Sequence, residues 1–377
     1  MLRVVEVISD MNIGGAGRLL INRIRNTDKT LFNITVILPK GSMLFDLLKE
    51  ERVSVIEIDG GKNKSFELKS VFKFYKLIKA LSPDIINCHG SMNARIAANL
   101  AGVKVKLFTR HCDFPIKGVF KIWAFRLVFG FLNNFISDAA IAVSDSAKNN
   151  LLELGIKEEK IKVIINGSQA QRKFSCEEKI CFKEQSNIST SAFIVGIFAR
   201  IEKCKDHSTF LKAANLLKNE NCLFIIVGTG SEEENIKRQV KELGLSGNVL
   251  FVGFVEDVAP WMNITDINVN CSIGTETSSL ALSEGMSLGI PAIVSDYPGN
   301  TYMVKDGENG MIFPQRDYKA LAEKIEYLMN NQDLYEKLSR NAYRRFFSEL
   351  NAENMTKQTE EYYIYLYNKK TCKNTDL

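Results

Sequence analysis

The hydrophobic pattern of the first half of the chain alternates between short apolar runs and longer stretches in which apolar residues recur every three or four positions. The short runs predict strands and the longer stretches predict helices. Strands are expected at residues 2–9, 34–38, 53–58, 84–88, 104–109, 140–144 and 161–165. Because helical stretches such as 43–49 and 68–81 separate these runs, the pattern predicts a doubly wound parallel sheet.

The same alternation restarts after an interruption. Residues 168–190 lose their periodicity and become polar and serine-rich, which indicates an interdomain linker. Further strands are expected at residues 193–198, 224–227, 249–252, 267–270 and 292–295, and terminal helices at 318–329, 334–347 and 355–367. The predicted fold class is α/β, with two doubly wound Rossmann-like domains facing a cleft. The domains are 1–167 and 191–354, and the last helix, about 355–370, is expected to cross back onto the first domain.

Length and composition agree with this division. The chain has 377 residues, which is more than one core accommodates, so two domains of roughly 150 to 180 residues are expected. Its eight cysteines form no CxxC pair, which favours reduced thiols in a cytosolic compartment. The strand pattern begins at once after Met1, so we expect no signal peptide.

Charge is spread unevenly along the chain. Residues 1–170 carry 25 Lys and Arg against 16 Asp and Glu, whereas the remainder carries 24 against 28. The basic half could face phosphates, nucleic acid or an anionic membrane surface. A solvated surface with a modest bias explains the same numbers.

The most aromatic part of the chain, residues 114–136, has three interpretations. Lys117, Lys121 and Arg126 interrupt it, which disfavours a membrane-spanning helix. An amphipathic helix on a membrane surface is the second interpretation. We favour the third, a helix mostly buried under the sheet, with only its basic and aromatic beginning (114–123) exposed.

Several candidate site residues follow predicted strands of the first half. Gly14 and Gly15 stand between a strand and a helix, where glycine lets backbone approach an anion, although the spacing is not GxGxxG. His89 and His111 each follow a strand, at the sheet edge where ligands of doubly wound folds bind. His207, at a predicted helix start, is interpreted as structural.

The stretch 276–291 combines two carboxylates with a predicted helix start. Ser279 is suited to cap a short helix that ends at Gly289, and Glu276 and Glu284 stand eight positions apart. Eight helical residues span roughly 12 Å, whereas hydrolase carboxylate pairs stand about 5 to 9.5 Å apart. Free N–H groups at the helix start favour an anion between the acids. The spacing therefore favours a grip on an elongated ligand such as a sugar–diphosphate–ribose.

An ordered set of motifs in the second half resembles the retaining glycosyltransferases of family 4, which have the two-domain GT-B fold. In chain order these motifs are Gly196-Ile-Phe-Ala-Arg200, Lys205-Asp206, Gly228-Thr-Gly230, Gly253-Phe254, Asp266, Glu276 with Glu284, Gly289-Ile-Pro291 and Asp306-Gly with Gly310. Weaker matches in the first half are Gly14-Gly15, Thr109-Arg-His111, Ala142-Val-Ser144 and Asn166-Gly167. The resemblance covers nearly the whole chain.

The resemblance implies a role for each matched residue. The implied catalytic residues are Arg200 and Lys205 at the donor diphosphate and Glu276 and His111 at the donor sugar. The implied donor-binding residues are Gly15, Glu284 at the ribose, Ser279 and Leu280 through their N–H groups, Gly228 and Phe254. His89 and Arg110 are candidates for the acceptor side.

The resemblance also implies the course of the reaction. Family members keep the anomeric configuration by attack on the face of the leaving group, so no protein nucleophile is required, and the sequence offers no obvious nucleophile–base pair. Because no Asp-x-Asp motif is present, we expect no cofactor and no tightly held metal. Arg200 and Lys205 would supply the positive charge instead.

The implied function is transfer of a hexose-type sugar from a nucleotide-sugar donor to a lipid-linked or polysaccharide acceptor. Such transfer serves cell-surface glycans of the capsule, exopolysaccharide or lipopolysaccharide type. It would take place in the cytoplasm, at the inner face of the plasma membrane, with peripheral contact to anionic lipid and without a nucleic-acid partner. A non-catalytic GT-B partner subunit and a sugar-nucleotide epimerase are the alternatives. The chain departs from the family pattern at Ser168 and Gln169 and at Pro298-Gly299 and Tyr302, which leaves the donor open.

Overall fold

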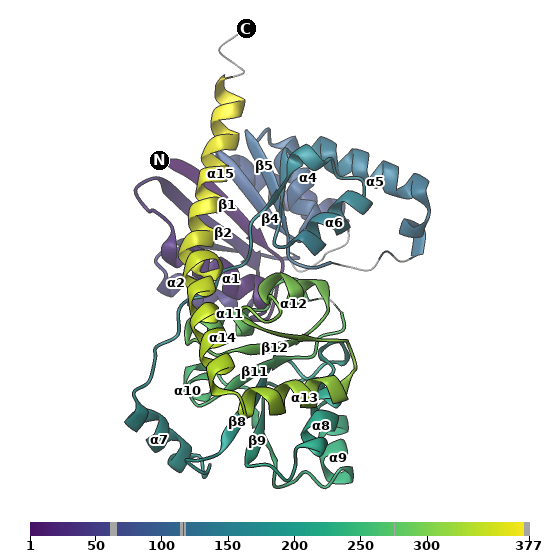
Figure 1. Ribbon diagram of the computed structural model, residues 1–377. Coiled ribbons are helices and arrows are strands. Elements are labelled where there is room, and N and C mark those ends of the chain that lie inside the picture. The colour runs from purple at the N-terminus through teal and green to yellow at the C-terminus, as the bar shows by residue number, and fades with distance from the viewer. Residues whose placement is uncertain (61–65, 114–115, 117, 275, 373–377) are drawn as a thin grey trace. The chain divides into compact units, whose positions relative to one another are not determined.

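The computed structural model describes residues 1–60, 66–113, 116, 118–274 and 276–372 of the chain. Contacts between residues divide the chain into two compact units. The first unit contains Met1–Gly167 and Ala352–Leu377, and the second contains Ser168–Asn351. The chain therefore leaves the first unit once and returns to it once (Figure 1).

The first unit is built on a seven-stranded parallel sheet in the order β3-β2-β1-β4-β5-β6-β7. Its strands are β1 (Leu2–Ile8), β2 (Phe32–Pro39), β3 (Ser54–Ile58), β4 (Ile85–His89), β5 (Val105–Arg110), β6 (Ala139–Ala142) and β7 (Ile161–Val163). Its helices are α1 (Gly15–Asn26), α2 (Leu44–Glu50), α3 (Leu68–Leu81), α4 (Met92–Leu100), α5 (Trp123–Ile136), α6 (Asp145–Glu153) and α15 (Ala352–Cys372).

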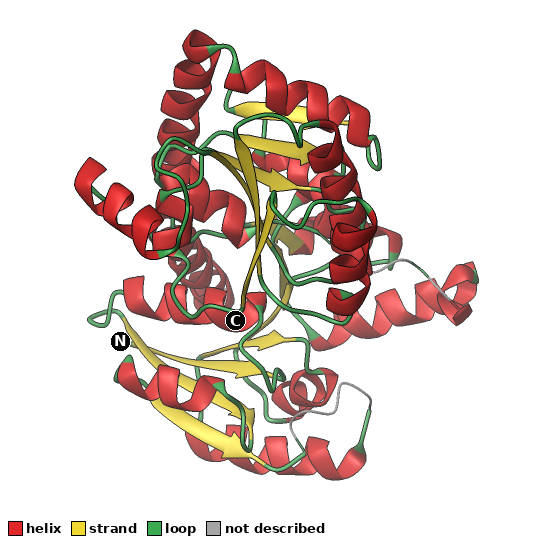
Figure 2. Cartoon of the chain, turned by 90° about the horizontal axis from the view of Figure 1, so that it is seen from below, coloured by secondary structure: helices red, strands yellow, loops and turns green. Residues whose placement is uncertain are grey.

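The second unit is built on a six-stranded parallel sheet in the order β10-β9-β8-β11-β12-β13. Its strands are β8 (Phe193–Phe198), β9 (Cys222–Val227), β10 (Val249–Gly253), β11 (Ile267–Asn270), β12 (Ala292–Ser295) and β13 (Gly310–Phe313). Its helices are α7 (Cys176–Gln185), α8 (His207–Leu216), α9 (Glu233–Glu242), α10 (Ala259–Asn263), α11 (Leu280–Ser287), α12 (Pro298–Met303), α13 (Tyr318–Met329) and α14 (Gln332–Arg345). Helices flank the sheets (Figure 2), and the predicted α/β class with two doubly wound sheets is confirmed.

Each sheet has its own apolar core. In the first unit the core gathers around Ile37, Phe74 and Ile86. In the second it gathers around Phe210 and Phe224, whose rings meet edge to face with centroids 5.4 Å apart. None of these five residues is more than 1% exposed. Strands buried on both faces read as continuous apolar runs, which is why the sequence pattern located them.

The strand order reverses once in each sheet, next to its first strand. In the first unit β1 lies between β2 and β4, and in the second unit β8 lies between β9 and β11. Connections that leave toward opposite sides of the sheet open a crevice at the carboxyl ends of the two central strands. Ligands of doubly wound sheets bind in this crevice. The reversals therefore locate one candidate binding region in each unit.

The stretch 168–190, expected to be a linker, contains the helix α7. Ser175 opens α7 with a capping box, because its hydroxyl accepts from Glu178 N at 3.2 Å while Glu178 Oε2 accepts from Ser175 N at 2.8 Å. Phe182 places its ring edge-on to Trp261 of α10, with centroids 5.1 Å apart. No residue of α7 is fully buried. A helix without a buried apolar stripe has weak periodicity, so the sequence pattern missed it.

The chain crosses between the units at two neighbouring positions. Ser168 pairs with Asn351 in an isolated bridge, and Ser168 N donates to Leu350 O at 3.1 Å. After Asn351, α15 packs against α1 of the first unit (Figure 1). Tyr363 of α15 donates to the carboxylate of Glu6 in β1 at 2.9 Å. The last helix is therefore part of the first unit's structure.

The aromatic segment forms a 3-10 turn (Gly118–Lys121) followed by α5, while its residues 114, 115 and 117 lie outside the described part of the chain. Within α5 only Gly130 and Asn133 are buried. The interpretation of α5 as a mostly buried helix is therefore wrong, because its large apolar side chains point outward. Among the described residues, no helix is both long enough and apolar enough to cross a bilayer.

Candidate active site

The second unit gathers polar side chains at the carboxyl ends of β8 and β11. Arg200 lies two residues after β8, with its side chain exposed. Lys205 ends the 3-10 turn that follows, and its side chain is 17% exposed. Asn270 ends β11, and Glu276 lies in the loop between β11 and α11. Loops that start from neighbouring strands thus bring Lys205 and Glu276 together.

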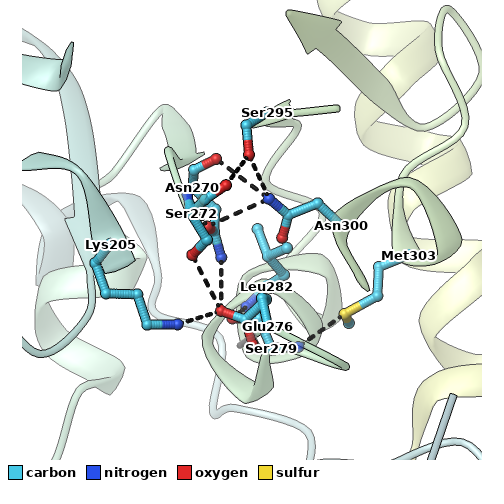
Figure 3. A network of polar contacts seen from close by, with 9 residues as sticks. All are labelled: Lys205, Asn270, Ser272, Glu276, Ser279, Leu282, Ser295, Asn300 and Met303. Atoms are coloured by element: carbon cyan, nitrogen blue, oxygen red, sulfur yellow. Dashed lines mark hydrogen bonds and ion pairs between the residues drawn. The ribbon is translucent and has the colours of Figure 1, made fainter. Parts of the chain in front are cut away.

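Lys205 and Glu276 form a buried ion pair (Figure 3). Lys205 Nζ contacts Glu276 Oε2, and the same oxygen accepts from Asn270 Nδ2 at 3.4 Å and from Ser272 Oγ at 3.3 Å. Glu276 is only 7% exposed. The family resemblance implies that Lys205 binds a diphosphate and Glu276 a sugar, whereas in this structure the two side chains bind each other. A ligand that engages either side chain must compete with this pair.

Further polar residues, which the sequence motifs do not include, hold the Glu276 loop in place. Ser295 Oγ, at the end of β12, donates to Ser272 O at 2.5 Å, and Asn300 Nδ2 donates to Ser295 Oγ at 2.9 Å (Figure 3). Asn300 Nδ2 also lies 3.4 Å from Asn270 Oδ1, which accepts from Ser272 N at 3.0 Å. The signal that could have found these residues is a polar side chain ending an apolar strand, as Asn270 and Ser295 do.

The departure at Pro298-Gly299 preserves a close backbone contact with the site. Pro298 is the first residue of α12, where the missing N–H of proline is tolerated. A Cβ on Gly299 would lie 2.1 Å from Glu276 O, so this position requires glycine. The backbone oxygen of Tyr302 accepts from Arg345 Nη2 at 2.8 Å, which ties α12 to α14. Gly299 therefore allows the start of α12 to pack directly against the backbone of the Glu276 loop.

The start of α11 presents weakly engaged hydrogen-bond donors. Ser279 is its N-cap, as predicted, and Ser279 Oγ accepts from Leu282 N at 3.4 Å. Ser279 N donates to Met303 Sδ at 3.1 Å, and a thioether is a weak acceptor. Ser278 Oγ is buried, and no partner for it exists among the described residues. Together with the positive end of the helix dipole, these groups suit an anion. Glu284 lies half-buried within α11.

Two glycines after β9 allow a close approach of two loops. A Cβ would lie 2.2 Å (Gly228) or 2.3 Å (Gly230) from a backbone oxygen of the loop after β8. Gly228 also has φ +137°, which side-chain-bearing residues rarely adopt. The absence of a side chain at these glycines therefore allows their loop to pack against the loop that carries Arg200. Phe254 follows β10 and is 64% exposed, which leaves its ring open for stacking.

His207 is a buried structural residue at the first position of α8. Burial, followed by the neighbouring charge of Lys205, lowers the pKa of His207 from its ordinary 6.5 to about 4. Its Nε2 atom has no hydrogen-bond partner in the described part of the chain. The imidazole is therefore neutral at physiological pH and supports the start of α8 behind Lys205.

In the first unit, His89 and His111 meet at the carboxyl ends of β4 and β5. His89 Nδ1 lies 2.7 Å from His111 Nε2, and the rings stack with centroids 5.0 Å apart. His89 Nε2 lies 2.8 Å from Glu6 Oε2. Both histidines line a cavity of about 40 Å³, together with Asn87 and Thr109. That volume accommodates one or a few water-sized groups next to the imidazoles.

Glu6, which the sequence pattern showed only as part of an apolar strand, is the centre of this cluster. Glu6 Oε1 contacts Arg23 Nη2 at 2.5 Å and accepts from Tyr363 Oη at 2.9 Å. Burial favours a higher pKa for Glu6, but the Arg23 guanidinium and His89 outweigh it and lower the pKa. The sequence signal that could have identified Glu6 as a site residue is a single acidic residue within an otherwise apolar strand.

An ionised Glu6 determines the proton positions on the two imidazoles. A carboxylate only accepts hydrogen bonds, so His89 Nε2 carries a proton. When His89 is neutral, its Nδ1 accepts from the Nε2–H of His111. Burial, followed by the charge of His89, lowers the pKa of His111 well below its ordinary value. The cluster therefore holds His111 neutral and in one tautomer.

The other predicted site residues of the first unit, Gly15 and Arg110, differ in their contacts with the rest of the unit. Gly15 opens α1, and a Cβ there would meet no atom within 4 Å, so the chain itself leaves room beside this backbone. By contrast, a Cβ on Gly17 would lie 2.6 Å from the side chain of Leu44. Arg110 Nη2 donates to Asn150 Oδ1 of α6 at 2.6 Å. Arg110 is therefore tethered within its own unit.

Comparison with known proteins places the chain in a family. Residues 178–345 match the family model of the glycosyl transferases group 1, and residues 13–172 match that of glycosyltransferase family 4. The chain is 25% identical over 328 residues to the UDP-Gal:alpha-D-GlcNAc-diphosphoundecaprenol alpha-1,3-galactosyltransferase of Escherichia coli, covering 83% of this chain and 84% of the relative. It is 27% identical over 356 residues to the GalNAc-alpha-(1->4)-GalNAc-alpha-(1->3)-diNAcBac-PP-undecaprenol alpha-1,4-N-acetyl-D-galactosaminyltransferase of Campylobacter jejuni, covering 92% of this chain and 94% of the relative.

A solved structure shows the same fold. Anabaena Alr3699/HepE, in complex with UDP and glucose, has a TM-score of 0.82 and 20% identity, covering 96% of this chain and 99% of that chain. The class defined by the two sheets and the matched motifs is thus the two-domain GT-B fold. The chain belongs to the family 4 glycosyltransferases, enzymes that transfer hexose-type sugars.

Proposed function

We propose that this glycosyltransferase moves a hexose-type sugar from a nucleotide-sugar donor to a lipid-linked or polysaccharide acceptor during the synthesis of cell-surface glycans. The observation that carries the proposal is the buried pair of Lys205 and Glu276 near the start of α11. A cation, weakly engaged N–H groups and two carboxylates match the diphosphate, sugar and ribose of such a donor. The name of the Escherichia coli relative supports a nucleotide-sugar donor and a polyprenyl-diphosphate-linked acceptor.

The donor residues take the roles that their chemistry suits. Arg200 and Lys205 neutralise the diphosphate, and the N–H groups of Ser279 and Leu280 donate to its oxygens. Glu284 accepts hydrogen bonds from the ribose hydroxyls, and Glu276 accepts from the donor sugar. The leaving diphosphate gains negative charge as the glycosidic bond breaks. Cations fixed in advance at that position therefore stabilise the transition state more than the bound donor.

The transferred sugar keeps its anomeric configuration in this proposal. The acceptor hydroxyl attacks on the face from which the diphosphate departs, and a diphosphate oxygen takes its proton, so no protein nucleophile is needed. Arg200 and Lys205 supply the charge that a metal would otherwise bring, and no resident metal takes part. Transfer should therefore persist in EDTA. Loss of transfer in EDTA, with recovery on adding Mg²⁺ or Mn²⁺, would contradict this part.

The reaction takes place at the cytoplasmic face of a membrane in this proposal. None of the eight cysteines, all of which lie in the described part of the chain, takes part in a disulfide. The names of the two relatives describe acceptors on undecaprenyl diphosphate, a membrane lipid. Peripheral contact of the enzyme with the membrane would bring its site to such an acceptor.

The first test is calorimetry with a panel of UDP-, GDP- and ADP-sugars. One member of the panel should bind, and Arg200→Ala, Lys205→Ala and Glu284→Ala should each weaken binding at least tenfold. If no sugar nucleotide binds, the chain acts as a non-catalytic partner subunit. If the bound sugar changes configuration at another carbon without any acceptor, it acts as an epimerase.

A second test uses the open space beside Gly15. A Cβ at Gly15 meets nothing in the chain, so Gly15→Ala should fold with unchanged stability. If the backbone there approaches the diphosphate, the same variant should weaken donor binding about tenfold or more. Gly247→Ala is the matched control, because its Cβ also meets no atom within 4 Å. Equal donor affinity in the two variants would remove Gly15 from the donor site.

A further inference from the structure

Helix α5 lies at the outer edge of the first unit (Figure 1), and most of its large apolar side chains are exposed. Trp123, Leu127, Phe131 and Phe135 recur every four residues and are 67%, 58%, 71% and 69% exposed. Val128 and Leu132 extend this stripe and are exposed as well. We call these six residues the outer face of α5. Exposed apolar side chains are ordinary when single, but a contiguous group marks an interaction surface.

The fully buried positions of α5, Gly130 and Asn133, are small or polar. Gly130 contacts Gly155 closely enough that a Cβ would lie 2.5 Å from Gly155 O. Asn134 Nδ2 donates to Gly155 O at 2.9 Å, and Asn134 Oδ1 accepts from Lys157 N at 3.2 Å. A surface helix of a globular protein normally turns its apolar stripe toward the core. The orientation of α5 is the reverse, so its apolar stripe is matched to an apolar environment outside the protein.

Charge indicates the kind of environment. No acidic residue occurs between Asp113 and Asp138, whereas Lys117, Lys121 and Arg126 do. Lys121 is exposed just before α5, whereas Arg126, one turn before the buried Gly130, is only partly exposed. Basic residues beside exposed aromatic and aliphatic side chains are typical of elements that lie in the interface of an anionic membrane. A symmetric contact between two copies would bring these cations together without an acid to balance them.

We propose that the outer face of α5 inserts into the interfacial layer of an anionic membrane leaflet, with Lys121 at the lipid phosphates. The helix has 14 residues, roughly 21 Å, and therefore lies in the plane of the membrane rather than across it. The inference deepens the proposed function and rests on it, because a lipid-linked acceptor is reached only at a membrane.

Vesicle flotation tests the docking surface. The full chain should float with vesicles that contain phosphatidylglycerol, less with pure phosphatidylcholine, and less again at high salt. The variant Trp123→Ala/Phe131→Ala/Phe135→Ala should lower the partition coefficient more than about tenfold, because three aromatic side chains leave the interface. The matched control Ile180→Ala/Leu216→Ala/Tyr327→Ala removes exposed apolar side chains of the second unit and should float like the parent.

The chain offers a direct optical readout, since Trp123 and Trp261 are its only two tryptophans. In Trp261→Phe the remaining indole belongs to the outer face of α5. Its emission should shift to the blue on addition of vesicles and be quenched by brominated lipid. In Trp123→Phe the remaining indole packs against Phe182 and should not respond.

Three results would overturn the proposal: equal flotation of the α5 triple variant and the parent, no response of Trp123, or light scattering that shows a dimer abolished by the α5 variant. Calorimetry with the nucleoside diphosphate that the donor panel identifies distinguishes a failure of docking from a failure of the proposed function. The α5 triple variant should bind this nucleotide like the parent while it no longer binds vesicles. If the parent binds vesicles through α5 but no sugar nucleotide, docking stands and the proposed transfer reaction fails.

Discussion

The buried pair of Lys205 and Glu276 makes a testable statement about the order of events at the donor site. If the diphosphate draws Lys205 to itself, the donor nucleotide has to break the ion pair before it gains the cation. The tests use UDP if the donor panel identifies a UDP-sugar, and otherwise the corresponding nucleoside diphosphate. The substitution Glu276→Gln removes the competing charge and keeps the shape of the side chain. We therefore expect Glu276→Gln to bind UDP more tightly than the parent while it loses sugar transfer.

The structure bounds the size of this gain. A hydrogen bond to a charged group contributes about 1.5–3 kcal/mol net. The Lys205 side chain is 17% exposed, so water replaces part of the lost interaction. We expect UDP to gain about 1–2 kcal/mol, which is about five- to thirtyfold in affinity. Lys205→Met should instead weaken UDP binding, because it removes the cation itself.

The same substitutions should also change the free energy of unfolding of the unliganded protein. Lys205→Met leaves the carboxylate of Glu276 buried with only Asn270 and Ser272 as donors. Its cost should be near the lower end of the roughly 3–5 kcal/mol typical of breaking a buried pair. The double variant Lys205→Met/Glu276→Gln should recover much of that loss in urea unfolding. If Glu276→Gln weakens UDP binding as much as Lys205→Met does, the pair is not a competitor of the donor and the reasoning is refuted.

Three further predictions follow from the geometry of the two units. Gly299→Ala places a Cβ 2.1 Å from Glu276 O, so UDP affinity should fall more than about tenfold, whereas Gly247→Ala, whose Cβ meets nothing, should leave it unchanged. The pKa of His207 is about 4 in the folded protein against an ordinary 6.5, so the unfolded chain binds the proton first and stability falls as pH drops below about 6.5. Between pH 7.5 and 5 this group alone removes about 2 kcal/mol, and chemical denaturation of His207→Gln should show a pH dependence smaller by that amount. With only three histidines in the chain, ¹⁵N spectra should show His89 with a proton on Nε2, and Glu6→Gln should shift that tautomer equilibrium. An unchanged spectrum would mean that Glu6 does not orient the ring.

The sequence was sufficient for features that depend on local periodicity and capping. Buried parallel strands read as apolar runs, so their positions and the doubly wound class could be predicted. Ser279 could be predicted as a helix cap because it stands directly before an apolar helix and two helix-ending residues follow the last turn. The order of the motifs then indicated the family, because Lys205 and Glu276 stand at the same places relative to the predicted strands as in the family pattern.

Features that depend on contacts across the chain could not be predicted. The Glu6 cluster joins β1 to His89 and to Tyr363, which lies 357 residues away. The support of the Glu276 loop by Asn300 likewise depends on how α12 folds back. The orientation of α5 was missed for a different reason. A periodic pattern shows that a helix has an apolar side, but it does not show whether that side turns toward the core or away from it.

The return of the chain to the first unit has a consequence for protein engineering. The final helix α15 is sequence-distant from residues 1–167, yet its Tyr363 bonds to Glu6 in the first strand. A chimera that exchanges the first unit between related enzymes must therefore take both segments from one parent, with junctions near residues 167 and 351. A graft joined only at residue 167 would pair a foreign β1 with the host's tyrosine and leave a buried carboxylate without a matched partner.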